Sequence, residues 1–159
     1  MPSGEPHPMS DTPLATVIVP CKGHAKELSR CLASLIRQVT SFAYETVVVD
    51  SASDPAVTSV ASGFPGVRVV RSQGDLRAGP ARNLGVRLSR ADYVAFIDAD
   101  CQAGETWVAT AVDELRRGAV MVGGPVLDAL PWHPIAVADN LLQFADFRPG
   151  REDGPARYF

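Results

Sequence analysis

The sequence predicts an α/β fold built on a doubly wound, mostly parallel sheet. Short apolar runs, typical of strands buried on both faces, recur at residues 16–20, 46–49, 67–70, 92–97 and 119–122. Segments with apolar residues at helical spacing lie between these runs. Because alternating strands and helices require right-handed crossovers, the pattern favours a Rossmann-like topology.

The first half of the chain contains three of the predicted strands. The strand at 16–20 precedes an amphipathic helix with an inner stripe of Leu28, Cys31, Leu32, Leu35 and Ile36. The strand at 46–49 ends at Asp50, and turn residues then lead into a short helix from Pro55 to about Ala61. The third strand covers 67–70.

The second half continues the alternation. Gly79 and Pro80 are predicted as the N-cap and first residue of a helix that ends near Leu88. The fourth strand at 92–97 is followed by a helix over 105–117, and its inner side is Trp107, Val108, Ala111, Val112 and Leu115. A fifth strand is predicted at 119–122, and a last helical pattern covers about 135–144.

Composition and charge exclude several classes of function. The net charge of −3 over 159 residues argues against a general nucleic-acid partner. No apolar run is long enough to span a bilayer. The cysteines, at 21, 31 and 101, show no metal-binding spacing and suit free thiols in a reducing compartment. We therefore expect a cytoplasmic protein.

The ends of the chain differ from its middle. Residues 1–13 have the composition of a flexible tail. From Arg148 the sequence becomes polar and rich in glycine, and it stops at Phe159 without an evident cap. We expect the fold to be C-terminally incomplete.

Polar residues gather where the predicted strands end. Pro20, Cys21, Lys22 and Gly23 follow the first strand, Asp50 the second, Arg71 and Arg77 the third, and Asp98 and Asp100 the fourth. In open α/β sheets, ligands bind beyond the carboxyl ends of the strands, where the strand order reverses. These residues therefore predict one site at one edge of the sheet.

Two carboxylates at this edge indicate a metal. Asp98 and Asp100 follow a buried strand and are separated by Ala99. If the segment is extended, both side chains point the same way. Hard oxygen ligands suit Mg²⁺ or Mn²⁺ held together with substrate phosphates.

Other residues at the predicted edge have two interpretations. Asp50 either caps a turn or accepts a hydrogen bond from a base or ribose. Lys22 and Arg77 are either solvated charges or phosphate contacts. Arg82 and Asn83 lie in the helix that begins near Gly79, whose N-terminus favours an anion. Asn83 has poor helix propensity, which suggests a hydrogen-bonding task.

Four segments in order resemble the family 2 glycosyltransferases. They are 16–20 with the helix through 31–35, then 47–54, then 79–85, and finally 92–100. The resemblance covers about residues 14–126 and implies a nucleotide-sugar-binding domain of the GT-A fold. Residues 127–159 would then begin the acceptor-side region.

The resemblance also implies roles for single residues. Pro20, Cys21, Lys22 and Gly23 would line the base pocket, and Asp50 would contact the base, commonly uracil. Arg77, Arg82 and Asn83 would lie near the nucleotide. Asp98, with Ala99 beside it, would approach the ribose or the metal, and Asp100 would hold Mg²⁺ or Mn²⁺ against the two phosphates.

The implied reaction is transfer of a sugar, with inversion, from a nucleoside-diphosphate sugar to an acceptor hydroxyl. A UDP-sugar is favoured as donor and a glycan or lipid as acceptor, in bacterial cell-envelope polysaccharide synthesis at the inner face of the membrane. The chain departs from the family where Cys21, Lys22 and Gly23 replace a common Thr-Tyr-Asn, which removes an aromatic stacking partner. Another departure is Ser51, which stands where the family often has a second acid.

The catalytic base is not identified. Glu152 and Asp153 form an acidic pair of the type used as a base, but the pair follows Asp100 too closely and lies in a polar loop. Two alternatives therefore stay open. One is a non-catalytic nucleotide-sugar-binding module. The other is a nucleotidyltransferase, which is disfavoured because the segment 20–24 holds a single glycine where those enzymes carry a glycine-rich phosphate loop.

Overall fold

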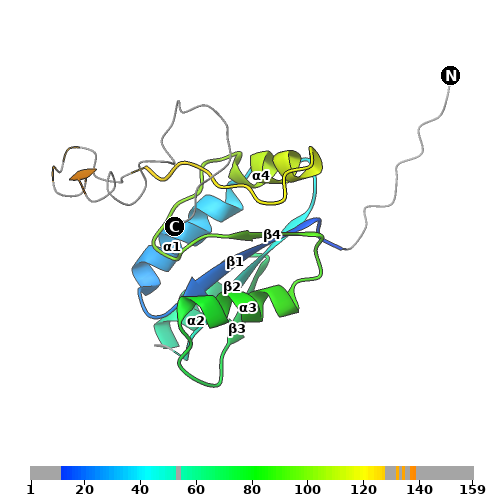
Figure 1. Ribbon diagram of the computed structural model, residues 1–159. Coiled ribbons are helices and arrows are strands. Elements are labelled where there is room, and N and C mark those ends of the chain that lie inside the picture. Colours follow the sequence, from blue (N-terminus) through cyan, green and yellow to red (C-terminus); the bar gives the residue numbers. More distant parts are fainter. Residues whose placement is uncertain (1–11, 53–54, 128–131, 133, 135–136, 139–159) are drawn as a thin grey trace. The chain divides into compact units, whose positions relative to one another are not determined.

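The computed structural model describes residues 12–52, 55–127, 132, 134 and 137–138 (Figure 1). The chain divides into two compact units, residues 1–113 and residues 114–159. The described sheet and its helices belong to the first unit, apart from the last residues of the fourth helix. Residues 1–11 of the predicted tail over 1–13, and the acidic pair Glu152 and Asp153, lie outside the described residues.

The described sheet has four parallel strands in the order β3-β2-β1-β4. They are β1 (Ala15–Cys21), β2 (Tyr44–Asp50), β3 (Val67–Arg71) and β4 (Tyr93–Phe96). The chain moves outward from β1 to β3 and then returns to place β4 on the other side of β1. The strand order therefore reverses between β1 and β4, which is where open α/β sheets bind ligands.

Helices cover both faces of the sheet, as a doubly wound fold requires. They are α1 (Ala25–Ile36), α2 (Pro55–Ser62), α3 (Ala78–Leu88) and α4 (Trp107–Arg116). Figure 1 shows α1 and α3 on opposite sides of the sheet, and the two buried clusters divide in the same way. The predicted fold class is confirmed.

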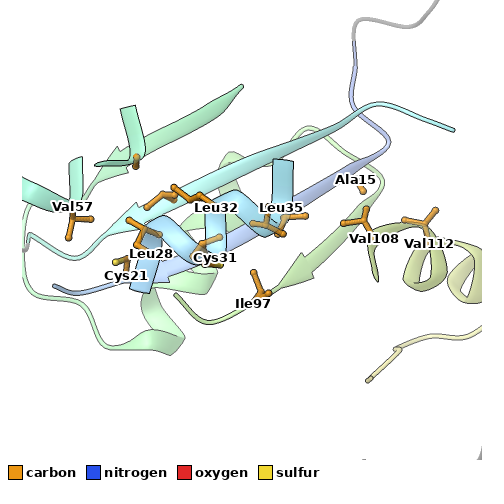
Figure 2. Packing of buried hydrophobic residues seen from close by; sticks show 14 residues of the cluster. Ala15, Cys21, Leu28, Cys31, Leu32, Leu35, Val57, Ile97, Val108 and Val112 are labelled. Carbon is orange, nitrogen blue, oxygen red and sulfur yellow. The ribbon is translucent and has the colours of Figure 1, made fainter. Parts of the chain in front are cut away.

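The larger core lies between the sheet and α1, α2 and α4 (Figure 2). Alternate residues of β1, Val17, Val19 and Cys21, face this side because successive strand residues point to opposite faces. The predicted stripe of α1 is buried at four positions, but Ile36 is 47% exposed. Ile36 is the last residue of α1, where the helix ends at the edge of the covered surface.

The smaller core lies under α3. Ile18 of β1 and Val47 and Val49 of β2 are fully buried with Ala81 of α3. Gly85 allows the helix to approach the sheet closely, since a Cβ atom there would lie 2.5 Å from Cγ2 of Ile18. This close packing holds α3 against β1.

The C-terminal end of α3 is held by side chains from the sheet. Nη2 of Arg68 donates a hydrogen bond of 2.8 Å to the carbonyl of Leu88. Oγ of Ser89 donates a hydrogen bond of 2.7 Å to Oγ1 of Thr16. Bonds from two strands thus hold α3 at the end opposite to the edge where the polar residues gather.

Two local predictions need correction, and a third falls mostly on residues that the structure does not describe. Helix α3 begins at Ala78 with Arg77 as its N-cap, and both positions are two residues earlier than predicted. The run 119–122 is not a strand, because it has no hydrogen-bonded neighbour among the described strands, and Val120 is 99% exposed. Most of the predicted helix at 135–144 lies outside the described residues.

Among the helices of the described part of the chain, none combines the length and apolarity that a bilayer crossing requires.

Candidate functional site

Two adjoining clefts open at the carboxyl edge of the sheet, where the strand order reverses. Their volumes are about 560 Å³ and about 280 Å³. Pro20, Cys21, Lys22 and Ala78 line both, so the end of β1 and the start of α3 form a shared wall. The rule that ligand sites lie at this edge therefore identifies a real concavity in this protein.

The larger cleft combines an apolar floor with charged residues. Beyond the shared wall it is lined by Ser51, Asp75, Leu76, Arg77 and Ala81. Nζ of Lys22 lies 2.6 Å from Oδ2 of Asp75, and both side chains are exposed. The ion pair thus joins the segment after β1 to the loop after β3.

The smaller cleft holds most of the predicted phosphate and metal residues. Beyond the shared wall it is lined by Gly23, His24, Arg82, Asp98, Ala99 and Asp100. The segments after β1 and β4 and one face of α3 contribute these residues. Residues from distant parts of the sequence are therefore brought together as the strand-end argument predicts.

The two acids reach the cleft by a turn and not by an extended strand. Strand β4 ends at Phe96, and the amide of Cys101 donates a hydrogen bond of 3.0 Å to the carbonyl of Asp98. The prediction that Asp98 and Asp100 share a side through strand alternation was wrong. Both still line one cleft, because the turn curls the backbone around it.

Asp98 already has a cationic partner. Nη2 of Arg82 donates a hydrogen bond to Oδ1 of Asp98 and forms an ion pair with it. The guanidinium comes from α3 and the carboxylate from the turn after β4. The smaller cleft therefore contains a positive and a negative group in direct contact.

A divalent cation fits the donors of this cleft only with help from a ligand. Within the described ranges no group of three or more His, Cys, Asp or Glu side chains could hold a metal. Asp98 and Asp100 supply hard carboxylate oxygens on an open surface. Since Mg²⁺ is commonly bound by one or two carboxylates together with substrate phosphates and waters, this donor set suits Mg²⁺ or Mn²⁺.

Three residues of the predicted site do not line either cleft, namely Asp50, Arg71 and Asn83. Asp50 is 0% exposed, and its Oδ2 accepts a hydrogen bond of 3.1 Å from Oγ1 of Thr58 and lies 3.6 Å from Nη1 of Arg71. Asn83 is exposed on α3 but is absent from both linings. The predicted contact between Asp50 and a base stays a prediction.

Unusual backbone conformations lie beside the clefts. His24 and Ala52 have φ angles of 57° and 50°, and Gly23 has a φ of 70°. Positive φ is uncommon for residues other than glycine. His24 and Ala52 follow the ends of β1 and β2, where the chain turns sharply away from the sheet.

The thiols near the clefts are poor nucleophiles. Burial, followed by the charge of Asp50, raises the pKa of Cys21 to about 11. Burial also raises the pKa of Cys31 to about 12, with smaller contributions from its neighbours. The pKa of Cys101 is raised by burial and then by the charges of Asp100 and Asp98. All three shifts disfavour the thiolate, which is the nucleophilic form.

Sequence reasoning missed several lining residues, namely His24, Ser51, Asp75, Leu76, Ala78 and Ala81. Of these residues, Asp75 matters most for ligand binding, because it is charged and lines the larger cleft. The signal that could have found it is the rule that located Arg77, since both lie in the loop after β3.

Comparison with known proteins now decides the family. The model of the family described as "Glycosyl transferase family 2" matches residues 16–135. This chain belongs to glycosyltransferase family 2. The resemblance inferred from the four sequence segments is therefore confirmed, and the match includes every residue lining the two clefts.

Relatives of this family 2 glycosyltransferase chain are distant. Glycosyltransferase AglE of Haloferax volcanii is 27% identical over 123 residues, covering 74% of this chain and 40% of AglE. Validoxylamine A glucosyltransferase of Streptomyces hygroscopicus subsp. jinggangensis is 34% identical over 108 residues, covering 65% of this chain and 26% of the relative. The chain thus spans less than half the length of these two relatives.

Solved structures confirm the GT-A fold of the family 2 glycosyltransferase chain. The mannosyltransferase PcManGT from Pyrobaculum calidifontis, in complex with GDP-Man and Mn²⁺, matches with a TM-score of 0.61 and 24% identity, covering 80% of this chain and 39% of that one. S. aureus TarS matches with a TM-score of 0.58 and 23% identity, covering 65% and 19%.

Proposed function

We propose that this chain binds a nucleoside-diphosphate sugar and belongs to an enzyme that transfers the sugar to an acceptor hydroxyl with inversion. The observation that carries the proposal is the meeting of Lys22, Arg82, Asp98 and Asp100 along one rim, at the reversal of the strand order. Family membership supports sugar transfer, and the similar mannosyltransferase was solved with GDP-Man and Mn²⁺.

The two clefts suit different parts of a donor. The larger one, about 560 Å³ with an apolar floor, has the size and character of a nucleoside pocket. The smaller one, with its paired carboxylates and Arg82, suits a diphosphate. The N-terminal end of α3, at Ala78, borders both and adds partial positive charge toward an anion.

In this proposal the chain's own residues bind and neutralise the leaving nucleoside diphosphate. Asp98 and Asp100 hold Mg²⁺ or Mn²⁺, which stabilises the charge that develops on the leaving diphosphate. Arg82 supplies a guanidinium to the diphosphate in the smaller cleft. Arg77, the N-cap of α3, supplies a second guanidinium from the larger cleft. Lys22 lies at the wall that both clefts share, where its ammonium is paired with Asp75 of the larger cleft.

The proposal covers the donor side. Residues 14–126 form the donor-binding domain in this interpretation, and residues 127–159 lead toward an acceptor-binding region for a glycan or lipid. The catalytic base that deprotonates the acceptor is not assigned, since the candidate pair Glu152 and Asp153 lies outside the described residues. Work at the inner face of the membrane, in polysaccharide synthesis, belongs to this proposal and rests on the family resemblance.

The identity of the base needs its own test. The family resemblance favours uridine through a contact with Asp50, but the carboxylate of Asp50 is buried and engaged by Thr58 and Arg71. The titrations therefore use both UDP and GDP.

The decisive experiment is calorimetric titration of the purified chain with UDP and GDP, with and without Mn²⁺. We expect at least one nucleotide to bind, more tightly with Mn²⁺. Asp100→Asn should weaken this metal-dependent binding by about tenfold or more, the equivalent of one good charge-assisted contact. Asp113→Asn, an exposed acid on α4, is the matched control and should bind as the wild type does. Failure of both nucleotides to bind would refute the proposal.

A turnover assay separates the proposal from its alternatives. Release of nucleoside diphosphate in the presence of an acceptor is expected from a glycosyltransferase. Pyrophosphate release would instead indicate a nucleotidyltransferase. Tight, Mn²⁺-dependent binding without turnover by the whole gene product would indicate a non-catalytic binding module.

A further inference from the structure

Three charged residues line the larger cleft, Lys22, Asp75 and Arg77, and the first two form an ion pair. Lys22 and Asp75 lie at its rim with Nζ and Oδ2 2.6 Å apart, and their side chains are 61% and 65% exposed. An exposed pair of this kind contributes only about 0–1 kcal/mol to stability. Both groups are therefore available to a ligand at little cost to the fold.

Asp50, the other acid near this cleft, is not accessible to a ligand. Asp50 follows β2 but is fully buried, with Thr58 and Arg71 at its carboxylate. Among the residues that line the larger cleft, Asp75 is the one carboxylate. The acid that a ligand in this cleft would meet is therefore Asp75, from the loop after β3, with Lys22 beside it.

A lysine next to an aspartate matches one nucleobase edge well. The pairing edge of guanine presents the O6 acceptor, then the N1–H and N2–H donors. Lys22 can donate to O6, while the two oxygens of Asp75 accept from N1–H and N2–H. Uracil presents O4, N3–H and O2 in the same order, so its second acceptor would face a carboxylate oxygen.

The remaining residues that line the larger cleft suit the face of a nucleobase ring. Pro20, Leu76, Ala78 and Ala81 provide apolar surface, and the volume of about 560 Å³ accommodates a purine nucleoside. None of the residues that line this cleft is aromatic, so recognition depends on the polar edge more than on stacking.

We infer that Lys22 and Asp75 select guanine, so that the donor of this chain is a guanosine-diphosphate sugar. The inference rests on the proposed function, because it assumes that a nucleotide occupies the clefts. It departs from the uridine donor that the family resemblance favours.

The test measures affinity for GDP, UDP and inosine diphosphate by calorimetry with Mn²⁺ present. Inosine diphosphate lacks the N2 amino group and retains N1–H and O6. We expect GDP to bind on the order of tenfold more tightly than either of the others, since a good bidentate contact discriminates bases by at least this factor.

The variant Asp75→Asn gives a readout that a purely structural role would not produce. An amide accepts from N1–H or N3–H through its oxygen and donates through its nitrogen, so it suits uracil better than guanine. The preference for GDP over UDP should disappear or reverse. Asp92→Asn, an exposed acid at the start of β4 and at the other end of the sheet, is the control and should keep the preference.

The outcomes separate the two proposals. If neither GDP nor UDP binds, the proposed function fails and the base preference with it. If both bind but UDP equals or exceeds GDP, or if Asp75→Asn retains the preference, the inference of guanine selection alone is overturned. Should Asp75→Asn fail to fold, the comparison of GDP with inosine diphosphate on the wild type still decides.

Discussion

The guanidinium of Arg82 is bound to the carboxylate of Asp98 at the point where a metal is expected. The pair joins α3 to the turn after β4, and both residues line the smaller cleft. A cation that approaches Asp98 therefore meets a positive charge that is already in place. Arg82 acts as a resident counter-ion for Asp98 in this state of the protein.

Removing that charge should improve metal binding in the absence of nucleotide. We expect Arg82→Gln to bind Mn²⁺ up to about fivefold more tightly, the range that an exposed ion pair represents. The same variant should bind nucleoside diphosphate more weakly when Mn²⁺ is present, because a phosphate partner is lost. Electron paramagnetic resonance of free Mn²⁺ gives the metal affinity. Arg87→Gln, on the same helix, is the control, and an unchanged Mn²⁺ affinity in Arg82→Gln would contradict the expectation.

Because α3 lies close to β1, we expect that one added methyl group on α3 lowers the stability of the protein. In Gly85→Ala the new Cβ would lie 2.5 Å from Cγ2 of Ile18, a fully buried side chain of the central strand. We expect the free energy of unfolding to fall by about 1–3 kcal/mol, as overpacked cores do. Urea denaturation measures the change.

Gly79→Ala provides the matched control, because nothing lies within 4 Å of a Cβ at that position of the same helix. It should be neutral or stabilising by about 0.5 kcal/mol, since alanine has the better helix propensity. Equal effects of the two substitutions would show that α3 does not pack as closely as described.

The hydrogen bond from Thr58 to Asp50 predicts a structural role for a buried acid. Thr58→Val keeps the shape but removes the 3.1 Å bond to a carboxylate with no exposed surface. The free energy of unfolding should fall by about 1–2 kcal/mol. Thr110→Val, at an exposed position of α4, should cost much less. If nucleotide affinity fell as strongly as stability, Asp50 would belong to the binding surface after all.

The buried thiol at the cleft wall predicts a loss of stability in alkali. Its pKa rises from an ordinary 9.0 to about 11 in the folded protein, so the folded state holds the proton more tightly than the unfolded state. The stabilisation is complete below about pH 9 and is lost as the pH rises through about 11. In Cys21→Ala the urea midpoint should fall less steeply across this range than in the wild type, and parallel pH profiles would disprove the assignment.

How far the sequence predicts the site differs from residue to residue. Asp98, Asp100, Arg82 and Lys22 were found from their position after apolar runs or in a helix start, and the clefts contain all of them. The backbone conformation of Asp98 and Asp100 differs from the prediction, because a turn and not a strand brings the two acids together. The rule that located Arg77 could also have found Asp75, but nothing in the sequence shows that Asp75 pairs with Lys22, which lies 53 positions away in the chain.

The alternation of strands and helices, the doubly wound class and the family are all determined by the sequence alone, because each depends on apolar periodicity or on motifs within short segments. Tertiary structure decided which charges face the clefts: Asp50 is buried against Thr58, Asp75 is exposed beside Lys22, and Asp98 is held by Arg82. It also decided that residues 119–122 are not a strand, since a strand forms only where a neighbour offers its hydrogen bonds. Burial and pairing arise between segments far apart in the chain, so no local pattern carries them.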